Sequence, residues 1–180
     1  STGAILDTLA AKKLLDDTMV IFTSDHGYFY GEHCLGPERR LAYEEAIRIP
    51  LLVRYPRLFR AGTTVESMVL SVDVAATALA AAGVRPPRPL HGRPLWSRRR
   101  RDAVLIEYYS DRVFPRIERM GYQAVRTERW KLIHYVDRGN ADEVYDLQAD
   151  PFELQNEIAN PRAPVPALRR QLASLVAEAQ

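Results

Sequence analysis

The hydrophobic positions in the first half of the chain alternate between helical spacing and short apolar runs. Apolar residues recur at near-helical intervals over residues 4–15, which predicts an amphipathic helix. Residues 19–22 form an apolar run that is short and rich in β-formers, which predicts a strand buried on both faces, as in a parallel sheet. A second short strand is predicted over residues 49–56, where prolines limit its ends. This alternation favours an α/β arrangement.

Between and after these strands the pattern predicts mainly helices. One or two helical turns are expected over residues 39–48, with Glu44 and Arg48 as an i,i+4 pair. Residues 65–69 suggest a further short strand. An alanine-rich helix is expected over residues 73–82, opened by Ser71 or Asp73 and closed by Gly83.

The second half of the chain has a different pattern. Four β-rich segments follow one another without helices between them, which favours an antiparallel sheet; they span residues 103–108, 122–126, 130–135 and 144–147. Residues 164–179 carry apolar positions on one helical face and predict a terminal helix that covers this sheet. We place a boundary at the four arginines 98–101, which gives two parts, residues 1–101 and residues 102–180.

Composition narrows the function classes only slightly. The chain has 180 residues, 47% of them hydrophobic, and a formal net charge of +2, which argues against nucleic acid as a bulk electrostatic partner. No apolar run is long enough to span a bilayer. The single cysteine excludes an internal disulfide framework and a zinc site built from several cysteines.

The first predicted strand ends in two polar side chains, Asp25 and His26, followed by Gly27. In open α/β sheets, ligands bind at the carboxyl ends of the strands. This position therefore suggests a metal-binding or catalytic pair. The alternative from these residues alone is a capping aspartate beside a hydrogen-bonded loop histidine.

Several segments together resemble the C-terminal half of a type I sulfatase, a family of the alkaline phosphatase superfamily. The resemblance is carried, in order and spacing, by the motifs at residues 23–27, 31–33, 43–45, 48–53, 72–77, 92–95, 143–147 and 150–153. It implies the C-terminal part of an alkaline-phosphatase-like α/β sheet domain, followed by a small antiparallel four-stranded sheet with a terminal helix. It also implies a sulfuric ester hydrolase that acts on a sulfate ester.

The resemblance assigns expected roles to four residues. Asp25 and His26 match positions where the family holds a calcium ion, and a hard cation prefers carboxylate oxygen. Imidazole is a less usual calcium partner, so His26 is alternatively the general acid that protonates the leaving oxygen. Arg39 stands where the family often places a sulfate-binding lysine. His33 either lines the pocket or only makes hydrogen bonds within its own loop.

The resemblance also implies what the sequence lacks. The family nucleophile is a formylglycine made from a cysteine in a Cys-x-Pro/Ala-x-Arg motif, and Cys34 is followed by Leu35, Gly36 and Pro37 instead. We therefore expect Cys34 to be an ordinary loop thiol, the remaining calcium ligands to lie outside these residues, and the isolated chain to show no turnover. Two alternatives stay open: a phosphoester or phosphonate hydrolase of the same superfamily, and a truncated binding module without catalysis. A sheet cut from its neighbours also favours self-association through an exposed edge.

Overall fold

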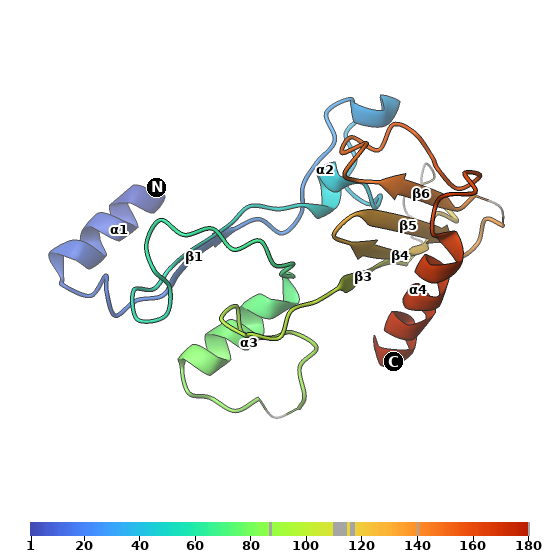
Figure 1. The fold of residues 1–180 in the computed structure, drawn as a ribbon. Helices are drawn as coiled ribbons and strands as arrows, with labels where there is room; N and C mark the ends of the chain where they lie inside the picture. The colour runs from blue at the N-terminus through green and yellow to red at the C-terminus, as the bar shows by residue number, and fades with distance from the viewer. Residues whose placement is uncertain (87, 110–114, 116–117, 140, 180) are drawn as a thin grey trace.

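The computed structural model describes residues 1–86, 88–109, 115, 118–139 and 141–179. The N-terminal region contains α1 (Thr2–Ala11), β1 (Val20–Thr23), β2 (Leu51–Arg54) and α3 (Val72–Ala81), and Figure 1 shows it beside a second region of four strands and a final helix. Within the described residues, no helix is both long enough and apolar enough to cross a membrane.

Strands β1 and β2 form a two-stranded sheet, and their pairing is antiparallel. The expectation of a strand buried on both faces of a parallel sheet was therefore wrong for the described residues. Phe22 and Leu52, which face each other in the register, are 52% and 61% exposed because no further described strand or helix covers them. The antiparallel register places the end of β1 at Thr23 beside the start of β2 at Leu51.

Residues 65–69 do not form a strand. They run without a ladder partner among the described residues, and a strand needs such a partner to satisfy its backbone groups. The chain continues directly into α3.

The start of α3 is fixed by the buried carboxylate of Asp73, which is 1% exposed. Its two oxygens accept hydrogen bonds from the backbone N–H groups of Leu70 and Arg93, at 2.8 and 2.7 Å. The guanidinium of Arg101 completes the site with two bonds of 2.6 and 2.7 Å. Asp73 thus ties three separate chain segments together.

Acid is expected to weaken this junction. Burial alone would raise the pKa of Asp73, but the hydrogen bonds from Arg101, Arg93 and Leu70 outweigh it and hold the pKa below its usual value. Because the pKa is lower in the folded state, the stabilisation is present above about pH 4, the ordinary aspartate value, and is lost as the pH falls further.

The measurement is urea unfolding of the wild type and Asp73→Asn at several pH values. We expect a stability difference of about 3 kcal/mol at pH 7 that shrinks between pH 5 and pH 2. Asp7→Asn, which changes an exposed aspartate of α1, should show no such difference at any pH. A difference for Asp73→Asn that stays constant down to pH 2 would contradict this account.

The second region is a four-stranded antiparallel sheet, as the sequence pattern predicted. Its strands are β3 (Ala103–Tyr108), β4 (Tyr122–Thr127), β5 (Trp130–Tyr135) and β6 (Glu143–Asp146), in that spatial order. Helix α4 (Val165–Ala179) packs on one face, where its Leu168 and Leu172 join Val125, Leu132 and Val144 in a buried cluster. Period-two alternation along the strands sends the neighbouring side chains to the opposite face.

That opposite face is covered by the segment that follows β1. This segment contains the short 3₁₀ helix η1 (Glu32–Cys34) and the single helical turn α2 (Glu44–Ile47), which lies against the sheet in Figure 1. Ala42 is fully buried here among aromatic and aliphatic side chains of β4, β5 and β6. The packing therefore connects the end of β1 to the second region.

Candidate functional site

Asp25 and His26 form a polar corner at the end of β1. The Asp25 side chain is 84% exposed, and its Oδ2 lies 3.3 Å from Nε2 of His26. The other imidazole nitrogen, Nδ1, is 2.7 Å from the carbonyl oxygen of Gly27. A carbonyl only accepts, so this contact places the proton on Nδ1 and leaves Nε2 to face Asp25 and the open side.

Backbone hydrogen bonds stabilise the ionised form of Asp25. Its own backbone N–H and that of His26 donate to the carboxylate, the latter at 3.0 Å, and both lower the pKa of Asp25. The hydroxyl of Ser24 also holds the turn, since it donates to the His26 carbonyl at 2.8 Å. The corner therefore offers an exposed, negatively charged oxygen beside an imidazole nitrogen.

Gly27 lets this corner contact α2 directly. Its backbone N–H donates to the carbonyl of Ala46 at 2.7 Å. A Cβ at this position would lie 1.8 Å from the carbonyl oxygen of Glu45, so only glycine fits. The position of Asp25 and His26 is thus set by where α2 lies.

A buried ionic network fixes α2 to the sheet. Lys131 of β5 is 0% exposed, and its Nζ lies 3.1 Å from Oε1 of Glu44 and 2.5 Å from Oε1 of Glu153. Arg126 of β4 adds a 3.1 Å contact to Oε2 of Glu44. Glu153 also accepts the backbone N–H of Glu44 at 2.7 Å. The expected Glu44–Arg48 pair is replaced by these contacts.

The network affects its two carboxyl groups in opposite directions. Burial alone would raise the pKa of Glu44, but Lys131 and Arg126 outweigh it and lower that pKa. Burial dominates at Glu153 and raises its pKa in spite of Lys131. The sequence motifs contained Glu44 and Glu153, whereas Lys131 was missed because a lysine in a strand normally indicates a solvent-exposed face.

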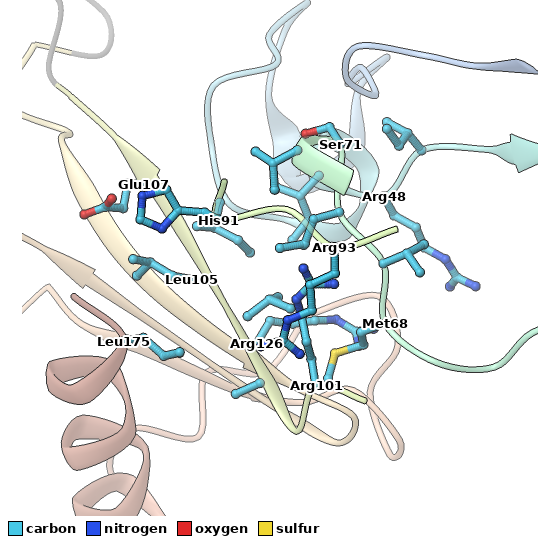
Figure 2. A pocket seen from close by; sticks show the side chains of 18 of the residues that line it. Arg48, Met68, Ser71, His91, Arg93, Arg101, Leu105, Glu107, Arg126 and Leu175 are labelled. Carbon is cyan, nitrogen blue, oxygen red and sulfur yellow. The ribbon is translucent and has the colours of Figure 1, made fainter. Parts of the chain in front are cut away.

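Asp25, His26 and Arg39 line one large cavity of about 1710 Å³ that lies between the two regions. Part of its wall is shown in Figure 2, where Ser71 and Arg93 lie across from Leu105 and Glu107. Arg39 is exposed, and its guanidinium makes no ion pair with any described residue. The backbone of Arg39 is held by Glu38, which accepts its N–H at 2.8 Å.

His33 lies elsewhere. Its ring stacks on Tyr43 at 4.1 Å, and Nε2 lies 3.2 Å from Oε2 of Glu45. It lines a smaller cavity of about 220 Å³ together with Tyr135 and Glu143. Three of the four predicted site residues therefore line the same cavity, and His33 lines a different one. Cys34, next to it, is an exposed free thiol.

The Asp25–His26 corner has the donors for part of a calcium site. Oδ2 of Asp25 and Nε2 of His26 lie 3.3 Å apart, so these two atoms would hold one side of the ion, and a hard cation prefers the carboxylate oxygen. Within the described residues, no three His, Cys, Asp or Glu side chains are grouped closely enough to hold a metal ion. The corner fits the ion as a partial site.

Comparison with known proteins finds matches along most of the chain. Residues 31–179 match the family model described as N-sulphoglucosamine sulphohydrolase, C-terminal. An N-acetylglucosamine-6-O-sulfatase of Bacteroides thetaiotaomicron is 33% identical over 191 residues, which cover 99% of this chain and 33% of that protein. A choline-sulfatase of Rhizobium meliloti is 30% identical over 168 residues, covering 91% of this chain and 31% of that protein. The chain thus spans about one third of the length of these relatives.

Solved structures share the fold. One, determined in complex with its substrate D-glucosamine-2-N,6-O-disulfate, has a TM-score of 0.85 and 32% identity and covers 99% of this chain and 37% of its own. A phosphonate monoester hydrolase of Agrobacterium radiobacter has a TM-score of 0.86 and 27% identity, with 98% of this chain and 38% of that one covered.

Proposed function

Because the chain belongs to the N-sulphoglucosamine sulphohydrolase C-terminal family of sulfatases, we propose that it forms one wall of the active site of a sulfuric ester hydrolase. The observation that carries this proposal is the Asp25–His26 corner, which opens into the same cavity as Arg39. The nucleophile and the other metal ligands would come from residues outside these 180.

In this proposal Asp25 is a ligand of a calcium ion. Its carboxylate is exposed, and backbone hydrogen bonds lower its pKa, which further favours the charged form. When bound, the cation would neutralise negative charge on a sulfate oxygen. Asp25 is also held in place by the turn, so little conformational freedom is lost when it binds.

His26 and Arg39 act on the ester itself. The Gly27 carbonyl keeps the proton on Nδ1 of His26, so Nε2 is the atom that either binds the metal with Asp25 or exchanges a proton with the leaving oxygen. The exposed guanidinium of Arg39 provides several donors for a tetrahedral oxyanion. His33, which contacts Tyr43 and Glu45, supports the loop beside the site in this scheme.

Calcium titration of the chain, followed by isothermal calorimetry, tests the metal assignment. We expect weak, saturable calcium binding that is lost in Asp25→Asn, because the only carboxylate at the corner becomes neutral. Asp7→Asn, the matched change in α1, should leave the binding unchanged. An identical response of wild type and Asp25→Asn would refute the ligand assignment.

We further expect the isolated chain not to hydrolyse 4-nitrophenyl sulfate, since neither Cys34 nor any other described residue sits in the family's nucleophile motif. The measurement is release of 4-nitrophenolate with calcium present, with a matched buffer blank as control. Turnover that survives purification and disappears in His26→Gln would show that the chain carries a complete site of its own.

Phosphonate ester hydrolysis is the second candidate, and the likeness to the phosphonate monoester hydrolase favours it. Sulfates and phosphonates are both tetrahedral oxyanions that an Asp–His–Arg wall can bind. Binding of phenyl phosphonate compared with phenyl sulfate, each measured for wild type and Arg39→Gln, separates the two. Equal failure of both ligands would leave a non-catalytic binding module as the better description.

A further inference from the structure

Arg93 lies on the wall of the large cavity, on the loop that follows α3. It is half-buried, and its Nη1 donates to the backbone carbonyls of Arg99 and Arg100 at 3.3 and 3.4 Å. These bonds hold the guanidinium in one place. Its Nε and Nη2 have no hydrogen-bond acceptor among the described residues.

Other arginines lie on the same cavity wall as Arg93. Figure 2 shows Arg93, Arg101 and Arg126 on this wall, and they come from the loop after α3, the segment just before β3, and β4. Arg101 is paired with Asp73 and Arg126 with Glu44. Within the described part of the chain, Arg93 has no carboxylate at ion-pair distance.

The local electrostatics are correspondingly unfavourable for Arg93 when nothing is bound. Burial, followed by repulsion from Arg101 and Arg99, lowers the pKa of Arg93, although Asp73 and Glu178 partly oppose this. Half-buried cations are usually paired because an unpaired charge away from water is costly. An anion bound at this position would pair with the partly buried charge of Arg93 and offset the repulsion from Arg101 and Arg99.

We infer that Arg93, with Arg99 and Arg101 beside it, forms a second anion subsite, which takes a sulfate or carboxylate group of a substrate that carries more than one such group. The inference rests on the proposed function, because it assumes that the first group is bound at Asp25, His26 and Arg39 in the same cavity. A guanidinium with two unused donors suits such oxyanions through paired, charge-assisted hydrogen bonds.

The first experiment titrates the chain with sodium sulfate at constant ionic strength and follows the arginine Nε–Hε signals by NMR. The Arg93 signal should move saturably, and Arg93→Gln should remove this transition while the Arg39 transition is retained. Arg60→Gln, the same charge change at an exposed arginine outside the cavity, should leave both transitions intact. Backbone amide spectra of each variant establish that it is folded.

The outcomes separate the subsite from the proposed function. If Arg39 responds to sulfate and Arg93 moves no more than Arg60, the second subsite is refuted and the proposed function stands. If Arg93 responds and Arg39 does not, the subsite stands and the proposed first sulfate contact is refuted.

A second experiment tests the link to a substrate with two charged groups. A disaccharide with one sulfate on each ring is compared with its monosulfated counterpart, and calorimetry gives the two affinities. The second sulfate should strengthen binding about tenfold in wild type and Arg60→Gln, and by less than about twofold in Arg93→Gln. An equal gain in Arg93→Gln would overturn the inference.

Discussion

Replacing Lys131 with methionine is expected to lower the free energy of unfolding by about 3–5 kcal/mol, the cost of breaking a buried ion pair from one side. The ammonium group is fully buried between Glu44 and Glu153, and methionine of similar length leaves both carboxylates without it. Arg126 still reaches Glu44, so Glu153 would be the group left without a charged partner. Urea unfolding at pH 7 measures the change.

An exposed lysine provides the control for this substitution. Lys12, at the end of α1, is exposed, and Lys12→Met should change the free energy of unfolding by less than about 0.5 kcal/mol. Because burial raises the pKa of Glu153, the loss in Lys131→Met should also become smaller below about pH 5, where Glu153 takes up a proton more readily. If the free energy of unfolding falls by less than about 1 kcal/mol at pH 7, the network does not fix α2 to the sheet as described.

Gly27→Ala is expected to have the second large effect. The new Cβ would lie 1.8 Å from the Glu45 carbonyl oxygen, so the corner and α2 have to separate. We expect a loss of at least about 2 kcal/mol in the free energy of unfolding, as for strongly overpacked sites. Calcium binding at Asp25 should weaken as well, because the Gly27 N–H to Ala46 bond orients the corner.

The matched control is Gly139→Ala, since a Cβ there meets no atom within 4 Å. Its free energy of unfolding should change by no more than about 1 kcal/mol, and calcium binding should be unaffected. If Gly27→Ala behaves like Gly139→Ala in both measurements, the contact between the corner and α2 does not set the position of Asp25.

The topology of the four-stranded sheet could be predicted from the sequence, whereas the pairing and burial of β1 could not. Each strand of the sheet pairs with its neighbour along the chain, so alternation and turns predict the topology from local information. The apolar run of β1 predicted a strand correctly, but burial and pairing are long-range properties: none of its residues is fully buried, and its described partner β2 is antiparallel. The extended segment at 65–69 was mistaken for a strand for the same reason.

Residue order was enough to nominate candidate site residues, whereas their packing partners could not be predicted from it. Asp25 and His26 lie just after a strand, and Arg39 was predicted from the resemblance to type I sulfatases by its place before residues 41–43. The separation of His33 arises from its stacking on Tyr43, which sequence spacing does not reveal. Lys131 reaches Glu44 across 87 residues, and its strand gave no signal that a charge faces inward.

The most direct test of the central claim is the ¹⁵N spectrum of the histidine side chains during a calcium titration, first without and then with sodium sulfate. Calcium should shift Nε2 of His26, because this atom lies 3.3 Å from the proposed ligand oxygen of Asp25, and sulfate should shift it further. His134, which lies outside the cavity, should stay unchanged, and Asp25→Asn should abolish the response to calcium. An unchanged His26 signal, or equal shifts at all four histidines, would contradict the assignment of this corner as a metal and sulfate site.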